Sequence, residues 1–347
     1  MLCDYKNSMR RVPELRFATE RGRLRKRASL ALLLISLAVR PAELVRYEAS
    51  AQAMGSVYTI AAYGPDRGQL SAAVEAAFTE VRRIDQLLSN YRATSELSEV
   101  NREAFQKPVK VSPELFDLLE KCRRYSELSE GAFDWTVGPL MKVWGFYRDS
   151  GRLPLPPEVG KALARTGYRR LHLNPENRAV RFQVQGMELD PGGIGKGYAV
   201  DRMVDLLREA GLETAFITAA GSSIYALGAP PSDPRGWYVR VRHPKSDALT
   251  VAELYLKDQS LSTSGAYEKF FVADGKTYSH IMDPRTGYPA QGMLSVSVLA
   301  PKTLDSEAWT KPFFIHGAGW TRDHIPDGFR VLLCEETQPC YWLPHPP

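Results

Sequence analysis

A glycine-rich turn at residues 190–201, DPGGIGKGYAVD, restricts the fold of this chain more than any other segment. It follows a strand-like run and opens a helix, and four glycines within six positions let backbone N–H groups approach a ligand closely. A helix N-terminus beside Lys196 favours a phosphate or pyrophosphate. The spacing matches neither the GxxxxGK[ST] phosphate loop nor a dinucleotide GxGxxG turn. The turn therefore predicts an anion site of another type or, as the plain structural alternative, a tight strand-to-helix connection.

The net charge of +5 on 347 residues is concentrated at one end of the chain. Residues 1–27 hold nine basic and three acidic side chains, so the remainder is close to neutral. No basic face for a nucleic acid is therefore expected. With 44% hydrophobic and 24% charged residues, the composition is that of a folded globular protein.

An apolar run at residues 28–39 follows the basic segment directly. Its length is short for a membrane span and suits the core of an export signal. We therefore expect residues 1–45 to be a basic N-terminal region with a signal peptide or an uncleaved anchor, and residues 46–347 to form one domain. The expected location is the periplasm or the outer face of the inner membrane.

Apolar periodicity along the rest of the chain predicts a mixed α+β body. Steps of three and four residues predict helices over 70–88, from 113 to about 131 with Ser112 as N-cap, and over 198–210 before Gly211. Alternation predicts strands over 56–63, 214–218, 237–242, 249–256 and 294–299. An exported protein permits a disulfide between Cys334 and Cys340, whereas Cys122 is expected in the core.

Two further segments carry residues suited to a binding site. Residues 131–147, GAFDWTVGPLMKVWGFY, surround Asp134 with aromatic side chains that can enclose a flat ring, although an aromatic core is the structural alternative. Residues 278–289, YSHIMDPRTGYP, place His280 two residues before a polar turn. A lone histidine is usually structural, so on this pattern alone His280 is a weak candidate.

Seven motifs, in this order, resemble the FAD:protein FMN transferase family, often called ApbE, from residue 54 to about 317. They are MGSVYTI at 54, LLSNYRATSELSEVN at 87, GAFDWTVGPL at 131, DPGGIGKGYAVD at 190, STSGAYEKF at 262, YSHIMDPRTGYP at 278 and APKTLDSEAWTKPFFIHG at 300. The resemblance implies a two-lobed α+β fold with the flavin between the lobes. It also implies an enzyme that cleaves FAD with magnesium, releases AMP and attaches FMN through a phosphoester to a Thr or Ser of an acceptor redox protein.

The resemblance implies contacts to FAD at eight positions: Met54, Tyr91, Ala132, Phe133, Asp134, Asp190, Lys196 and Ile281. The first five would face the flavin ring, for which sulfur and aromatic contacts are suitable. The others would face adenosine and pyrophosphate. Lys196 and His280 are the catalytic candidates, Lys196 for charge neutralisation and His280 for proton transfer from the acceptor hydroxyl.

The magnesium ligands that the resemblance implies are an Asp, a Thr four positions later and a backbone carbonyl of the glycine-rich turn, here Gly193. Glu307 stands at the Asp position and keeps a hard oxygen ligand, but Lys311 stands at the Thr position and cannot bind a cation while charged. A slip of one residue would offer Thr310 instead. Alternatively, the ammonium of Lys311 occupies the cation's place and pairs with Glu307 and the diphosphate.

These residues lead to one main hypothesis and two alternatives. The main hypothesis is an exported flavin transferase that moves FMN from FAD to a hydroxyl side chain of a redox protein. The first alternative is an exported FAD-binding protein that does not cleave FAD because its magnesium site is impaired. The second is an FAD pyrophosphatase, in which water replaces the acceptor hydroxyl.

Overall fold

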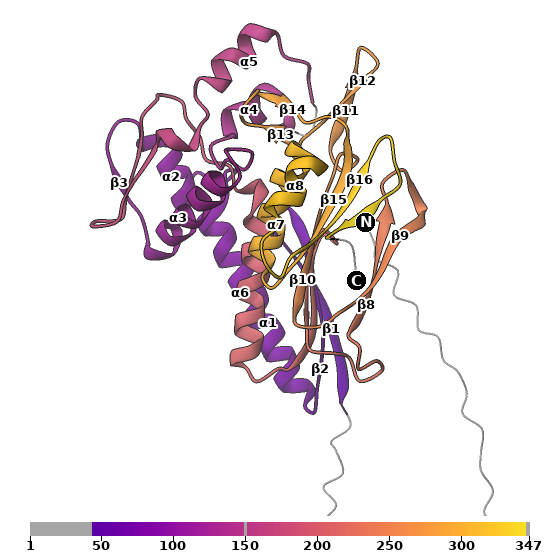
Figure 1. Ribbon diagram of the computed structural model, residues 1–347. Coiled ribbons are helices and arrows are strands. Elements are labelled where there is room, and N and C mark those ends of the chain that lie inside the picture. The colour runs from indigo at the N-terminus through magenta and orange to yellow at the C-terminus, as the bar shows by residue number, and fades with distance from the viewer. Residues whose placement is uncertain (1–43, 149–150, 345–347) are drawn as a thin grey trace, which may run out of the picture.

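A large antiparallel sheet forms the centre of the protein (Figure 1). The computed structural model describes residues 44–148 and 151–344. The strands of this sheet are β1 (Val45–Ala53), β2 (Ser56–Gly64), β6 (Thr214–Ala219), β7 (Ser223–Leu227), β10 (Gln259–Gly265), β15 (Met293–Ala300), β16 (Arg330–Glu335) and β17 (Tyr341–Leu343). They lie in that order across the sheet, and each pairs antiparallel with its neighbours.

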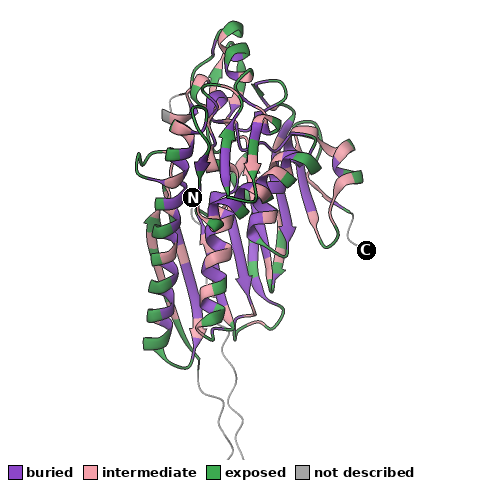
Figure 2. Cartoon of the chain, turned by 90° about the vertical axis from the view of Figure 1, so that its left-hand side faces the viewer, coloured by how far each residue is buried: buried purple, intermediate pink, exposed green. Residues whose placement is uncertain are grey.

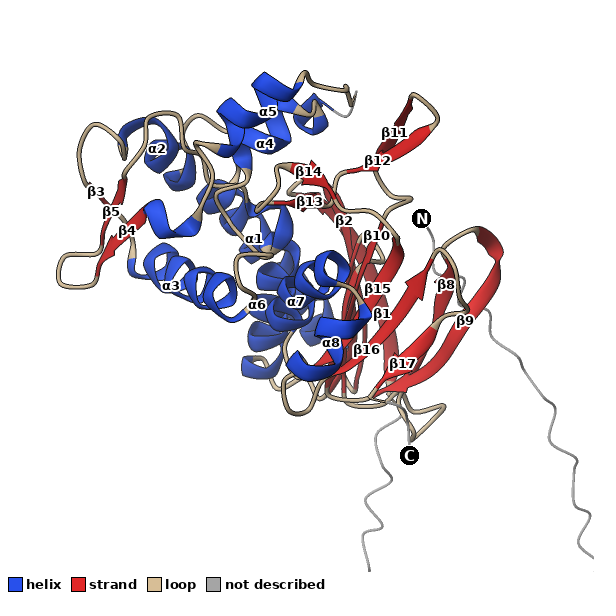
Figure 3. Ribbon diagram, turned by 45° about the horizontal axis from the view of Figure 1, so that its top comes forward, coloured by secondary structure: helices blue, strands red, loops and turns tan. Residues whose placement is uncertain are grey.

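Three helices cover one face of this sheet: α1 (Arg67–Leu88), α6 (Gly195–Glu209) and α7 (Thr303–His316). Apolar side chains at three- and four-residue steps, such as Val74, Phe78 and Val81, give α1 one buried side. Figure 3 shows the three helices on the same side of the strands. In Figure 2 the buried residues follow the strands and the inner sides of the helices, and the exposed residues lie on the outer sides. The main core therefore lies between the helices and the sheet.

A separate hairpin of β8 (Trp237–His243) and β9 (Ser246–Leu256) covers part of the opposite face. Trp237 and Val239 of this hairpin belong to one apolar cluster with Ile224 and Ala226 of β7. Because the helices and the hairpin cover both faces of β7, all five of its residues are buried.

The segment between α1 and α6 forms a smaller second lobe. It contains α2 (Glu96–Glu103), α3 (Pro113–Leu128), α4 (Gly138–Val143), α5 (Pro156–Leu163), the 3-10 helices η1 (Phe146–Arg148), η2 (Tyr168–Arg170) and η3 (Pro191–Gly193), and a sheet of β3 (Val109–Lys110), β5 (Ala179–Phe182) and β4 (Leu171–Asn174). The remaining elements are the hairpins β11 (Phe270–Ala273) with β12 (Lys276–Ser279) and β13 (Met282–Asp283) with β14 (Tyr288–Pro289), and the helix α8 (Ala318–His324). Figure 1 shows α2, α3 and β3 on the far side of α6 and α7 from the large sheet. The predicted mixed α+β fold with two lobes is confirmed.

The predicted helices and strands are present, with two differences at the site. Ser112 caps α3 as expected, its Oγ accepting a hydrogen bond of 3.3 Å from the N–H of Leu115. However, α6 begins at Gly195, three residues before the predicted start, so two of the glycines lie within its first turn. The residues just before the turn are not a strand: β5 ends at Phe182, and Glu188 makes a single parallel bridge to Val137.

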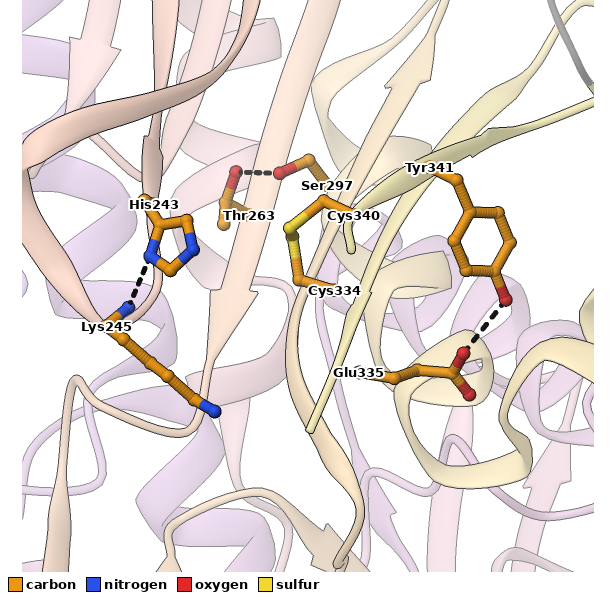
Figure 4. The surroundings of a disulfide bond; sticks show 8 residues. All are labelled: His243, Lys245, Thr263, Ser297, Cys334, Glu335, Cys340 and Tyr341. Carbon is orange, nitrogen blue, oxygen red and sulfur yellow. Dashed lines mark hydrogen bonds between the residues drawn. A yellow bond between two sulfur atoms is a disulfide. The ribbon is translucent and has the colours of Figure 1, made fainter. Parts of the chain in front are cut away.

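The three cysteines of the described residues lie where the sequence suggested, and Cys3 lies outside those residues. Cys334 and Cys340 form a disulfide between β16 and the start of β17 (Figure 4), and Cys122 is a buried free thiol. The basic region and the apolar run at 28–39 lie outside the described residues. Within 44–148 and 151–344, no helix is long and apolar enough to cross a membrane.

Candidate active site

The glycine-rich turn lies between the second lobe and helix α7. Asp190 caps η3, because its Oδ1 accepts a hydrogen bond of 2.7 Å from the N–H of Gly192. A Cβ atom added to Gly197 would lie 2.5 Å from the carbonyl oxygen of Thr303, the first residue of α7. Glycine at this position therefore allows α6 and α7 to approach each other closely.

Helix α7 presents Glu307 and Lys311 to this turn from positions one helical turn apart. The Nζ of Lys311 donates hydrogen bonds of 2.9 Å to the carbonyl oxygens of Gly193 and of Glu307. The Oε2 of Glu307 accepts a hydrogen bond from the N–H of Gly197. Lys311, Glu307 and Gly193 thus meet as the sequence predicted, but the atom placed on the Gly193 carbonyl is the ammonium nitrogen.

Thr310 does not take part in this contact. Its Oγ1 donates to the carbonyl of Glu307 and lies 2.7 Å from the Oγ of Ser264 on β10. The side chain is fully buried against the large sheet. The slip of one residue that would bring Thr310 to the turn is therefore not the arrangement of this protein.

The charged groups of the site influence one another. Burial lowers the pKa of Lys311 to about 8, with the Glu307 carboxylate opposing this shift and the charge of Lys196 adding to it. Lys311 therefore remains mostly protonated at pH 7. Lys196, from the first turn of α6, donates a hydrogen bond to the Oγ of Ser222 in the turn between β6 and β7. The two ammonium groups are close enough to repel each other.

The donor set does not fit a magnesium ion. Magnesium requires oxygen ligands in near-octahedral geometry, but here the Gly193 carbonyl accepts from an ammonium and the Glu307 carboxylate accepts from a backbone N–H. In the part of the chain that the structure describes, no group of three or more His, Cys, Asp or Glu side chains is placed to hold a metal ion. The positive charge beside the turn is supplied by lysine.

His280 lies beside the same cationic groups. Burial lowers its pKa to about 4, with the charges of Lys311, Lys196 and Lys269 contributing to the shift and a hydrogen bond to the Lys269 carbonyl opposing it. The Nδ1 atom lies 3.2 Å from that carbonyl oxygen, and the ring meets Phe146 edge-on at 6.4 Å between centroids. The imidazole is therefore neutral at pH 7 and has the capacity to accept a proton.

Met54 and Phe133 form apolar contacts on the turn. A Cβ atom at Gly195 would lie 3.1 Å from the Cε of Met54, and one at Gly193 would lie 3.5 Å from the Cε2 of Phe133. The N–H of Asp190 donates a hydrogen bond of 2.8 Å to the carbonyl of Trp135, which ties the aromatic stretch 131–147 to the turn. The structure thus brings the predicted sulfur and aromatic contacts to the anion site.

Tyr91 lies at the exposed end of this region. Its ring is 78% exposed and lies 5.6 Å, between centroids, from that of Tyr147. The Nδ2 of Asn90 donates to the hydroxyl of Tyr147, and among the described residues the buried Oδ1 of Asn90 has no hydrogen-bond partner. Sequence reasoning missed Asn90, although it precedes Tyr91 in the motif at residue 87. This oxygen is a buried acceptor that the protein leaves unsatisfied.

Asp134, Ala132 and Ile281 lie in supporting positions. The buried carboxylate of Asp134 accepts hydrogen bonds from the N–H and hydroxyl of Thr136 and from the N–H of Tyr168, so it holds its own loop. Ala132 is buried beside it. Ile281 belongs to the core cluster packed under α7, and its carbonyl accepts from the N–H of Ala290. Contact of these three residues with a ligand stays a prediction.

A groove of about 1700 Å³ extends from this region along the large sheet. Its lining includes Met54 and Gly55 at one end and Trp237 and Tyr238 of the β8–β9 hairpin at the other. The two site lysines and His280 do not line it. Of the predicted site residues, only Met54 lines this groove.

The fold and this site define an α+β protein whose glycine-rich turn lies between two lysines and beside apolar and aromatic side chains. These are the requirements of a nucleotide that carries a flat ring. The chain belongs to the ApbE family, whose model matches residues 54–327.

Individual relatives agree with this assignment. The chain is 35% identical, over 77% of its length and 82% of the relative's, to an FAD:protein FMN transferase of Klebsiella pneumoniae (strain 342). It is 36% identical to an FAD:protein FMN transferase of Treponema pallidum (strain Nichols), over 72% of each chain. Among solved structures, an ApbE protein of Thermotoga maritima matches with a TM-score of 0.76 and 31% identity, over 85% of this chain and 96% of that one.

Proposed function

We propose that this protein is an FAD:protein FMN transferase. The observation that carries the proposal is the placement of Lys196 and Lys311 at the glycine-rich turn, with His280 near enough for both charges to lower its pKa. Relatives that cover most of the chain are named for the same activity. Transfer of a phosphoryl-linked group depends mainly on positioning and charge neutralisation, and two lysines on a turn rich in N–H groups supply both.

In the proposed reaction, the hydroxyl oxygen of an acceptor Thr or Ser attacks the phosphorus of the FMN half of FAD. The bond from that phosphorus to the AMP oxygen breaks, and AMP leaves with the electron pair. His280 takes the proton of the hydroxyl. The negative charge of a bound diphosphate offsets the lysine charges that lower the pKa of His280, so the imidazole becomes more basic when FAD is bound.

The ring of FAD is proposed to lie against Met54 and Phe133, with Tyr91 at the exposed edge. Asp190 keeps the turn in shape and Lys196 holds the diphosphate. A magnesium ion at Gly193 and Glu307, as the family resemblance implies, finds no suitable donor set. No step of the proposed reaction uses one.

We further propose that the protein acts outside the cytoplasm, in the periplasm or on the outer face of the inner membrane. The support is the basic and apolar sequence of residues 1–39 and the disulfide between Cys334 and Cys340, which is typical of oxidising compartments. The proposed partner is a redox protein with a Thr or Ser acceptor site. The N-terminal segment is the proposed means of any membrane association.

The test uses purified protein, FAD and an acceptor protein with a single Thr acceptor, with the Thr→Ala acceptor as control. AMP release is followed by chromatography and the acceptor's mass by mass spectrometry. We expect AMP and a flavin-modified acceptor in equal amounts, with Lys196→Gln reducing both by about 100-fold, the scale of one transition-state contact. Lys107→Gln, an exposed lysine paired with Glu103, is the matched control.

Two other results would contradict the proposal. Release of AMP without modification of any acceptor would identify an FAD pyrophosphatase. Bound FAD with no AMP under any condition would identify an FAD-binding protein.

A further inference from the structure

We propose that Lys311 is a built-in cation of the active site, which replaces the divalent metal and makes FAD cleavage independent of added magnesium. This inference rests on the proposed transferase function and names the residue that supplies the positive charge of the active site. It differs from what the family resemblance implies, because the resemblance places a metal ion where this chain has an ammonium group.

The hydrogen bonds of Lys311 leave it able to bind an anion. An ammonium group has three N–H donors, and two of these go to the carbonyls of Gly193 and Glu307. No third hydrogen bond and no ion pair of this ammonium is found within the described ranges 44–148 and 151–344. A buried charge without an ionic partner is costly, so this position favours a ligand that brings negative charge.

A second cation strengthens this conclusion. Lys196 lies in the first turn of α6, three residues after Gly193, whose carbonyl accepts from Lys311, so both ammonium groups belong to the same turn. Lys196 is bound to a neutral group, the hydroxyl of Ser222. Neither ammonium forms a direct ion pair within the described residues, although the Glu307 carboxylate acts on Lys311. A dianion placed beside both would stabilise these two like charges. The diphosphate of FAD has that charge.

The packing of α7 holds the ammonium in a fixed place. Asp201 of α6 accepts hydrogen bonds of 2.7 Å and 3.0 Å from the N–H groups of Thr303 and Leu304, which caps the start of α7. Gly197 lets the two helices meet closely at the same point. Lys311 lies two turns further along this anchored helix. A fixed charge needs little reorganisation during the reaction, which is the main requirement for electrostatic catalysis.

The first experiment measures AMP release by the full chain in EDTA and in magnesium. We expect the wild-type rate to differ by less than about twofold between the two conditions. We expect Lys311→Thr to lose at least about tenfold in EDTA and to recover in part with magnesium, because a hydroxyl then replaces the ammonium. Lys311→Met should lose activity without recovery, and Lys107→Thr should behave like the wild type. Wild-type turnover that EDTA abolishes and magnesium restores would overturn the proposal.

The second experiment does not depend on turnover, so it separates this proposal from the transferase function. Binding of ADP and of riboflavin is measured by calorimetry in EDTA. We expect Lys311→Met to weaken ADP binding by at least about tenfold, the typical effect of one charge-assisted contact, and to leave riboflavin binding unchanged. Lys311→Arg keeps the charge and should retain most of the ADP affinity, which controls for damage to the fold. Equal ADP affinities of the wild type and Lys311→Met would refute a cationic role, whatever the activity of the enzyme.

Discussion

Replacement of Gly197 by alanine tests whether the contact between α6 and α7 builds the site. The new Cβ atom would lie 2.5 Å from the carbonyl oxygen of Thr303 and 2.8 Å from the Oε2 of Glu307, whereas ordinary contact begins at 3.4 Å. The carboxylate has some freedom to turn aside, but the Thr303 oxygen is a backbone atom. The helices must therefore separate, and this separation moves Lys311 away from Gly193.

The matched control is Gly160→Ala in α5, where no atom lies within 4 Å of the added Cβ and the backbone is equally helical. That change should raise the free energy of unfolding by up to about 1 kcal/mol, because alanine is the better helix former. Gly197→Ala should lower it by about 1–3 kcal/mol, the usual cost of overpacking. Urea titrations followed by circular dichroism measure both values, and calorimetry with ADP measures the effect on the site. If Gly197→Ala were as stable as Gly160→Ala and bound ADP normally, the close contact would not constrain the helices.

Two further predictions concern Asp201 and His280. Asp201→Ala removes the carboxylate that caps the N–H groups of Thr303 and Leu304. It should lower the free energy of unfolding, measured by urea titration, by about 1 kcal/mol. The control is Asp205→Ala, at an exposed position on the same helix. The pKa of His280 falls from 6.5 in the unfolded chain to about 4 in the fold, so between these values the unfolded state binds more protons and stability decreases as the pH falls. Urea titrations from pH 7 to 4.5 should show a smaller decrease for His280→Gln than for the wild type.

The sequence predicted the long helices more reliably than the strands of the large sheet, because β1, β10, β16 and β17 were not among the predicted strands. Long amphipathic segments such as α1 have many apolar positions, so one deviation does not hide the period. The edge strand β1 was missed because its sequence, VRYEASAQA, alternates small or polar residues and is partly exposed along its length. Its place is set by antiparallel pairing with β2 over nine residues, across the two-residue turn at Met54 and Gly55, and the apolar pattern of β1 itself does not indicate this pairing.

Residue types at the site were also predictable, but the direction of individual side chains was not. The carboxylate of Asp134 accepts a hydrogen bond from the N–H of Tyr168, 34 residues along the chain, which its motif did not indicate. Asp201 was not predicted at all, because it caps a helix that begins a hundred residues later. Both carboxylates satisfy backbone N–H groups that would otherwise be buried without partners. Sequence motifs identify such aspartates without showing which distant N–H they serve.

The choice between Thr310 and Lys311 shows why the large sheet determines the chemistry of the turn. Neighbouring residues of an α-helix point about 100° apart, so α7 cannot direct both side chains to Gly193. A register with Thr310 at the turn would carry Lys311 away from it, whereas in the observed register the small hydroxyl of Thr310 fits against Ser264 of β10. Another side of the helix then faces the glycine-rich turn. There the carbonyl oxygens of Gly193 and Glu307 accept hydrogen bonds from the ammonium group of Lys311. The packing of α7 on β10 therefore places position 311, and with it the lysine side chain, at the glycine-rich turn.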